Sequence, residues 1–204
     1  MEKIKLTKGE LKKQRDALKQ YERYLPTLQL KKQQLQVEIL RQLESLGEKK
    51  HVEALKKKTI ENWAGLLAEP QVHIAQWLKK ASRIDFKNIA GVDIPVFTGV
   101  DFVSAEYDLF VMPLWVDHAL EALRALVALR EEIATIEKGI EILRNELRIT
   151  TQRVNLFEKV KIPESLEAIR IIKIYIGDQM ANAVGRSKIA KSKIERYELL
   201  EVDA

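Results

Sequence analysis

The stretch LREEIATIEKGIEILRNELRITTQRVNLF, Leu129 to Phe157, decides the fold. Apolar residues recur in this stretch at alternating spacings of four and three residues, which places them on one side of a helix. The positions are Leu129, Ile133, Ile136, Ile140, Leu143, Leu147, Thr150, Val154 and Phe157. Such a seven-residue repeat is the seam of a coiled coil, so the stretch predicts a long helix packed along a second helix at a shallow angle.

The N-terminal segment offers the second helix. Its seam positions are Leu11, Leu18, Tyr21, Leu25, Leu28, Leu35, Ile39 and Leu46, with polar exceptions at Gln14, Lys32 and Gln42. We expect a helix from about Thr7 to about Asn62, with Thr7 as N-cap and Glu10 completing a capping box. Pro26 lies inside it, and because the period keeps its phase there, a kink is expected rather than a break.

The C-terminal segment changes phase at Pro163. Beyond it the apolar pattern resumes, shifted, through Leu166, Ile169, Ile172, Ile176, Met180 and Val184. We expect the helix to kink near Pro163, because proline removes a backbone hydrogen bond. Gly177 and Gly185 each cost about 1 kcal/mol of helix stability relative to alanine, so the sequence leaves open whether the end beyond Gly177 is helical.

Residues 62–116 have a different character. They hold three of the five prolines, all three tryptophans and several β-branched runs. They predict a short helix, strand pieces at 83–86, 92–97 and 100–105, and turns at 88–91 and near Gly99. Pro95 is expected at a sheet edge or a bulge.

These segments define a mainly α fold. Residues 1–62 form an N-terminal helix, 63–114 a small central α+β knob with a short helix and a β-hairpin, and 115–204 a C-terminal helix kinked near Pro163. The two long helices are predicted to fold back as an antiparallel two-helix coiled coil. The composition agrees, because 32% of residues are charged and only 6% aromatic, which suits helices that meet along narrow seams.

Composition also bounds the class of protein. The chain has no cysteine, which excludes disulfides and thiolate metal sites. No apolar run approaches the ~20 residues of a membrane-spanning helix, and the first residues lack the apolar core of a signal peptide, so a soluble cytoplasmic chain is expected. The 35 basic and 30 acidic residues are interspersed. The lysine-rich stretches 48–58 and 186–196 are therefore interpreted as solvated helix faces rather than a nucleic-acid site.

No catalytic constellation stands out. The stretch AGVDIPVFTG, residues 90–99, lacks the ending of a phosphate-binding loop, and the three histidines belong to no metal-ligand motif. Carboxylate pairs such as Glu131 with Glu132 are expected on solvated faces. We expect no metal, no cofactor and no enzymatic activity, so that function lies in shape, stiffness and contact surfaces.

Three segments resemble one family. The run TTQRVNLFEKVKIPESLEAIRIIKIYI, residues 150–176, closely resembles the signature of the D subunit of the V-type and archaeal-type rotary ATPases. NIAGVDIPVF, residues 88–97, and LTKGELKKQRDAL, residues 6–18, resemble two further segments of that family. The matching positions of the first run are Thr151, Arg153, Val154, Asn155, Glu158, Ile162, Pro163, either Ile169 or Ile172, Lys173, Tyr175 and Ile176. The chain departs from the family pattern at Tyr24, Pro26 and Lys31 to Gln33.

The resemblance implies a rotor axle. In that family the coiled coil enters a hexamer of A and B subunits, which binds and cleaves ATP. The other end joins the F subunit and the stalk subunit that links to the membrane rotor ring, so the chain is expected at the membrane periphery. A coiled-coil scaffold outside any motor is the alternative. The sequence distinguishes neither protons from sodium ions nor ATP synthesis from hydrolysis.

Two residue sets carry these expectations. The signature residues with a possible partner contact are Thr151, Arg153, Asn155, Glu158, Pro163 and Tyr175. Whether Arg153 and Asn155 instead set the register between the two helices remains open at this point. The coiled-coil seam is assigned to Leu11, Leu18, Leu28, Leu35, Ile136, Ile140, Leu143, Leu147, Val154 and Phe157.

Overall fold

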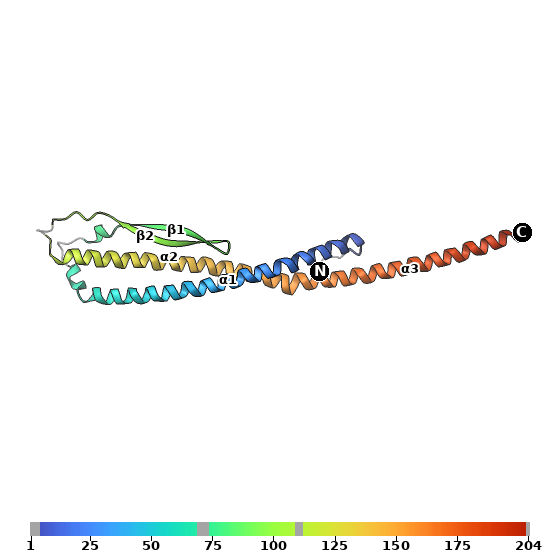
Figure 1. Cartoon of the computed structure of the whole chain (residues 1–204), viewed down its shortest axis with the longest axis horizontal. Helices are drawn as coiled ribbons and strands as arrows, with labels where there is room; N and C mark the ends of the chain where they lie inside the picture. Colours follow the sequence, from blue (N-terminus) through green and yellow to red (C-terminus); the bar gives the residue numbers. More distant parts are fainter. Residues whose placement is uncertain (1–4, 69–73, 109–111, 203–204) are drawn as a thin grey trace. The chain divides into compact units, whose positions relative to one another are not determined.

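The computed structural model describes residues 5–68, 74–108 and 112–202. Most of these residues are helical, and a single hairpin supplies the sheet, as the sequence predicts (Figure 1). The elements are α1 (Lys8–Glu61), the 3-10 helices η1 (Ala64–Ala68) and η2 (Ile74–Leu78), β1 (Lys80–Ile89), β2 (Val92–Phe102), α2 (Trp115–Leu156), the π-helical turn η3 (Phe157–Lys161) and α3 (Ile162–Val202). The chain divides into two compact units, described separately below: Leu30–Thr151, and the residues before and after it.

Thr7 is the N-cap of α1, as predicted, but the predicted capping box is wrong, because the Thr7 N–H bonds the Lys5 carbonyl and not the Glu10 side chain. The Thr7 hydroxyl accepts the Glu10 backbone N–H at 3.2 Å, and the Thr7 carbonyl accepts the Leu11 N–H at 3.0 Å. The Glu10 carboxylate accepts instead from the Gln14 amide at 2.9 Å, so it serves the first turn of the helix rather than the cap backbone. Further along, α1 continues through Pro26 as one helix, as its unbroken period predicts.

The core of unit Leu30–Thr151 lies where α1, α2 and the hairpin meet. Leu35 and Leu143 are fully buried there, and Ile39 and Ile94 complete the cluster. Among the described residues, four ion pairs join the two helices: Lys31 with Glu146 at 2.6 Å, Lys50 with Glu137 at 2.7 Å, Lys49 with Glu132 at 2.8 Å and Arg130 with Glu53 at 3.0 Å. As residue numbers rise along α1 they fall along α2, so the helices are antiparallel in this unit.

A second apolar cluster surrounds the start of α2. Ile74, Trp77, Val116, Ala119 and Leu120 are buried, and Trp63, Tyr107 and Trp115 pack against them. The short helix predicted for the central segment is thus two separate 3-10 turns. Leu67 of η1 and Trp77 of η2 pack against the apolar cluster that includes residues of α2. This packing stabilises 3-10 turns that are too short to be stable alone.

The hairpin has the predicted tip. Ile89 pairs with Val92, and the two residues between them, Ala90 and Gly91, both have positive φ, 52° and 77°. Two-residue hairpin loops favour this geometry because it matches the strand twist. The Asn88 side-chain oxygen accepts the Gly91 N–H at 3.1 Å and closes the turn.

The turn predicted near Gly99 is wrong. β2 continues through this position to Phe102, and the pairing register shifts there, since Arg83 pairs with Gly99 but Ile84 pairs with Phe97. Thr98 is the extra residue of a β-bulge, and its hydroxyl donates to the Arg83 carbonyl at 2.8 Å. A glycine inside a strand pattern is found at bulges as well as at turns, so the pattern around Gly99 did not distinguish the two.

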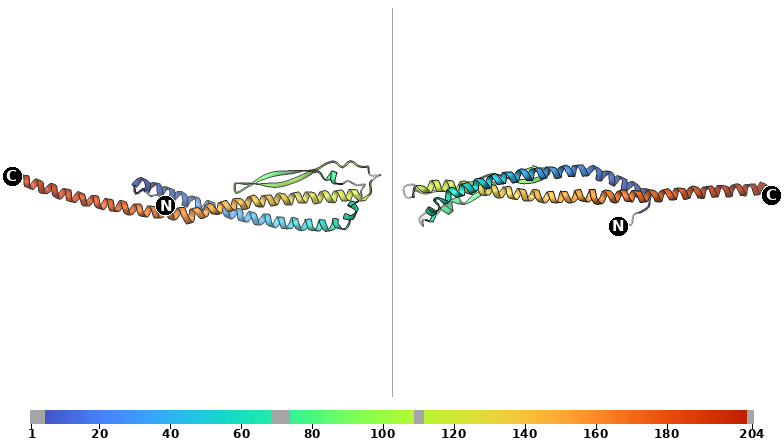
Figure 2. Two further views of the ribbon diagram at one scale, coloured as in Figure 1. Left: turned by 180° about the vertical axis from the view of Figure 1, so that it is seen from behind. Right: turned by 90° about the horizontal axis from the view of Figure 1, so that it is seen from below.

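The other unit holds the start of α1, the end of α2, η3 and α3. The Tyr21 and Phe157 rings meet with centroids 5.2 Å apart. Both views of Figure 2 show α3 running on past the first turn of α1. The helix is continuous through Gly177 and Gly185, which answers the question the sequence left open, and residues 177–196 are exposed.

The change of phase has its origin one turn before the proline. Residues Phe157–Lys161 are wound as a π-helix, and the Ile162 N–H bonds the Phe157 carbonyl five residues back. A π turn inserts one extra residue, so a heptad passing Val154 and Phe157 resumes one position late. It then runs through Ile162, Ser165, Ile169, Ile172 and Ile176, each buried or half-buried.

Three positions of the shifted pattern were wrongly predicted. Leu166, Met180 and Val184 are 51%, 53% and 57% exposed. The seam passes Ser165 in place of Leu166, because the extra residue falls in η3. Met180 and Val184 lie in the stretch of α3 that α1, which begins at Lys8, does not cover.

Candidate functional site

Four of the six signature residues lie on the surface around the π turn. Arg153 and Asn155, in the last turn of α2, are exposed, as are Glu158 in η3 and Pro163 at the start of α3. Within the described ranges, no side chain bonds to that of Arg153, Asn155 or Glu158. Tyr175 is 39% exposed, and its hydroxyl accepts from the Gln179 amide at 3.1 Å. Thr151 belongs to the other unit, where it is half-buried.

Helix geometry separates the buried and exposed members of this segment. Val154 is buried and Phe157 packs on Tyr21, so these two point into the helix pair. Arg153 and Asn155 flank Val154, each turned about 100° to one side of it. A polar group that sets the register of a coiled coil needs a partner across the seam, and these two have none in the residues described. They are therefore available for a second molecule, and such contact stays a prediction.

Pro163 explains why the π turn is where it is. Proline has no N–H, and its ring clashes with the carbonyl one turn earlier in an ordinary helix. The π turn just before it widens the backbone at that point and rearranges the carbonyls. As a result Glu158 and Lys159 sit on a locally widened, exposed surface.

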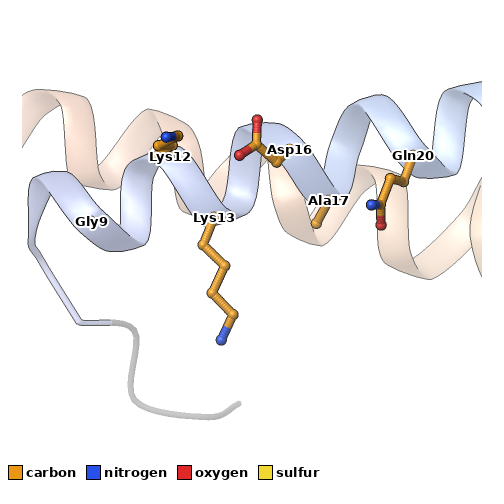
Figure 3. Close-up of a pocket in the computed structure, with 6 residues that line it drawn as sticks. All are labelled: Gly9, Lys12, Lys13, Asp16, Ala17 and Gln20. Carbon is orange, nitrogen blue, oxygen red and sulfur yellow. The ribbon is translucent and has the colours of Figure 1, made fainter.

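One surface hollow of this unit lies beside α1. It is lined by Gly9, Lys12, Lys13, Asp16, Ala17 and Gln20 (Figure 3). All six come from a single helix, and the figure shows the Lys13 side chain directed away from that of Asp16. The hollow is an open helix surface, not an assembled binding site.

Ion pairs in the other unit hold elements together. The Glu131 carboxylate on α2 accepts from the Lys80 ammonium and, at 2.8 Å, from the Ser82 hydroxyl, so it fastens the first residues of β1. Its pKa is lowered, first by the Lys80 hydrogen bond and then by Ser82. The pKa of Glu53 is lowered by hydrogen bonds from Lys57 and from Arg130, the latter joining α1 to α2.

The long-range contacts of Glu131 and Arg124 were not predicted from the sequence. Glu131 was expected on a solvated face, which is wrong, because Lys80 and Ser82 cover it. Arg124 was passed over, and its guanidinium donates to the carbonyls of Val103 at 2.6 Å and Trp77 at 3.3 Å. The only local signal for Arg124 is a single arginine among the leucines and alanines of LEALRALVAL.

The described residues hold no group of three or more histidines, aspartates and glutamates placed to bind a metal ion. None of the helices, over the same residues, combines the length and apolar character needed to cross a membrane.

Comparison with known proteins gives a consistent result. The family model of the ATP synthase D subunit matches residues 10–192. The V-type ATP synthase D subunit of Borreliella burgdorferi is 46% identical over 196 residues, covering 95% of this chain and 96% of its own. The protein of the same name from Chlamydia pneumoniae is 35% identical, covering 94% and 93%, and that of Chlamydia trachomatis 32%, covering 95% and 97%.

The match spans nearly the whole length on both sides, so it covers the segments of all the long helices and of the hairpin and not only a short motif. It includes the signature run from Thr151 to Tyr175 and the hairpin. The chain belongs to the family of ATP synthase D subunits.

Proposed function

We propose that the chain is the central rotor subunit of a V-type ATP synthase. In this role it couples ATP hydrolysis or synthesis in a hexamer of A and B subunits to rotation of the membrane ring and to ion translocation. The observation that carries the proposal is family membership along residues 10–192. The same membership disfavours the alternative of a scaffold outside any motor.

The proposed mechanism is a bias on the catalytic sites. ATP is bound and cleaved by the hexamer, and this chain supplies no catalytic group and no cofactor. At each angle the rotor presents different side chains to the three catalytic interfaces, so each interface favours a different nucleotide state. The coupling is limited by the difference in contact free energy between these states.

The signature residues are the proposed contacts with the hexamer. Arg153, Asn155 and Glu158 are exposed and form no side-chain bonds within the described chain, so they can bond to a partner without breaking an internal contact. Charged contacts at a wet surface are each weak, and they can break and re-form as the rotor turns. Pro163 and Tyr175 are proposed to contribute to the same surface, and Thr151, in the other unit, is proposed as a separate partner contact.

The remaining partners are proposed for the other unit. The F subunit and the stalk subunit that leads to the membrane ring would bind there and turn with the chain. The chain would then be a peripheral, cytoplasmic part of the complex, with no nucleic acid among its partners.

Single-molecule rotation tests the proposal. The A and B subunits are reconstituted with this chain, the hexamer is fixed to a surface, and a bead is attached at Lys58, which is exposed in the last turn of α1 in unit Leu30–Thr151. Unidirectional rotation upon addition of ATP is expected. A chain that binds no A or B subunits, or a bead that stays still while ATP is hydrolysed, would contradict the role.

A further inference from the structure

The segment that follows Phe157 carries two overlapping seams, one residue apart. The seam in use, called the first seam, consists of Ile162, Ser165, Ile169, Ile172 and Ile176, all buried or half-buried. If the helix stayed α-helical through η3, the heptad that passes Val154 and Phe157 would continue one position earlier. Those positions, called the second seam, are Lys161, Glu164, Ala168, Ile171 and Tyr175.

The second seam is apolar over its last two turns. Ala168, Ile171 and Tyr175 follow one another at three and four residues, the spacing of a helix seam. Ala168 is already buried and Ile171 is half-buried, so both lie at the edge of the present contact. A turn of α3 by one residue, about 100°, would bring them to its centre. The run AIRIIKIYI, residues 168–176, thus offers an apolar face in either orientation.

The first turn of the second seam is charged, but it contains its own counter-ion. The Lys161 ammonium lies 3.4 Å from the Glu164 carboxylate. After a one-residue turn, Glu164 would take the buried place of Ser165, which is 5% exposed, and Lys161 would remain beside it. Burying a carboxylate without a partner is costly, so this pairing lowers the cost without removing it. The first seam therefore remains the more stable one.

Pro163 also favours the first seam. In η3 the Ile162 N–H bonds the Phe157 carbonyl. In an ordinary α-helix the same N–H would bond the Glu158 carbonyl, and the Pro163 ring would clash with the Lys159 carbonyl. The proline thus raises the free energy of the α-helical form without affecting the packing of the second seam. Two packings of one segment that differ by a few such contributions form a two-state element.

We propose that η3 is a register switch. When its π turn becomes α-helical, α3 turns by about 100° against the start of α1, and the second seam replaces the first while both helices stay folded. The Tyr175 side chain, now 39% exposed, then turns towards α1. Under the rotor proposal, torque on α3 would select between the two orientations. The switch itself is a property of the isolated chain, so it goes beyond that proposal and can fail independently of it.

Thiol labelling of the isolated full chain tests the switch. The chain has no cysteine, so I172C introduces the only thiol. Ile172 is 0% exposed, and in the second register it would take the exposed place of Lys173. The rate of reaction with N-ethylmaleimide therefore follows the population of that register. P163A should raise this rate about 100-fold, because it removes the clash with the Lys159 carbonyl. An unchanged rate overturns the proposal.

A matched pair of leucine substitutions separates a register change from local unfolding. Glu164 and Glu195 are both on α3, their side chains are 58% and 59% exposed, and each is paired with a lysine one turn earlier. Only position 164 belongs to the second seam. In the P163A background, E164L should raise labelling at position 172 at least about tenfold further, because this leucine is buried only in the second register. E195L should change it less than about twofold. Equal rates for E164L and E195L overturn the proposal.

Two further thiol positions check the folding of the variants. I169C should respond to P163A and E164L as I172C does, because Ile169 also leaves the first seam, and it serves as the reporter if I172C does not fold. V154C should not respond, since Val154 is 4% exposed and precedes the turn. Acceleration at position 154 equal to that at 172 shows unfolding of the helix pair instead of a register change, and it overturns the proposal.

Discussion

At the scale of single residues, the informative side chains are those that join segments distant in sequence. Glu131 binds Lys80 and Ser82, which lie about 50 residues earlier. Arg124 reaches the carbonyls of Trp77 and Val103 from the middle of α2. No local pattern reveals such partners, since the identity of the partner depends on how α2 and the hairpin pack.

The Glu131 contact predicts a pH dependence of stability. Its carboxyl pKa is lower in the folded chain than in the unfolded one, so the stabilisation is present above the ordinary glutamate pKa and is lost as pH falls through the folded value. E131Q should therefore have a lower Tm than the parent at pH 7, and the difference should shrink below about pH 4. Thermal melts of both proteins from pH 3 to 8 measure this. A Tm difference that does not vary with pH would contradict the assignment.

Removing the Arg124 side chain should destabilise unit Leu30–Thr151. R124A leaves two backbone carbonyls without their donor and removes the guanidinium stacked 5.4 Å from the centre of the Phe102 ring. We expect a loss of about 1–3 kcal/mol in the free energy of unfolding, measured by urea titration. R23A is the control, because Arg23 is exposed and lacks a side-chain partner among the described residues. It should change stability by less than about 0.5 kcal/mol. Equal effects would count against the role of Arg124.

At the scale of elements, hydrophobic period predicted the long helices well because a seven-residue repeat leaves little choice of structure. The sequence also contained the phase change after Phe157. It did not reveal the cause, since a proline kink and a π turn both shift the pattern, and only the backbone hydrogen bond from Ile162 to Phe157 distinguishes them. The hairpin tip was predictable from its Ala-Gly turn, whereas Gly99 was ambiguous between turn and bulge.

The π turn predicts opposite effects for a deletion and an insertion. Deleting Val160 together with P163A, which removes the clash of the proline ring in an ordinary helix, restores an unbroken heptad from Val154 through the former Ile169 and Ile172, so helicity and Tm should stay close to those of the parent. Inserting an alanine after Val160 turns both isoleucines about 100° away from the seam and should lower Tm by several degrees or more. Circular dichroism melts of the two variants give the comparison. Equal destabilisation by both changes would show that η3 does not set the register.

At the scale of the whole molecule, function was predictable because three segments, residues 6–18, 88–97 and 150–176, resemble segments of one family in the same order. The fold requires Val154 and Phe157 at their positions, but it does not require Arg153 or Asn155. Contact of these side chains with a second molecule is a prediction that the substitutions below test. The partner surfaces themselves could not be predicted, because the same exposed residues fit either solvent or a protein.

Because the fold requires Val154 but not Arg153 or Asn155, we expect that the stability of the chain and its coupling in the complex can be changed separately. R153A/N155A removes exposed groups without internal partners, so the free energy of unfolding of the isolated chain should change by less than about 0.5 kcal/mol. In the reconstituted complex the same variant should reduce ATP-driven ion transport several-fold more than ATP hydrolysis, because the rotor biases the catalytic sites without forming them. Urea titration and paired transport and hydrolysis assays measure the two effects.

V154A is the matched control, since it alters the residue between the two. Val154 is 4% exposed, so its truncation should cost about 2 kcal/mol of stability, while the contact surface on either side of it keeps its side chains. Once the complex is assembled at a temperature where the variant is folded, the ratio of transport to hydrolysis should equal that of the parent. If V154A uncouples the complex as strongly as R153A/N155A, the surface assigned to the polar pair is not the one that transmits rotation.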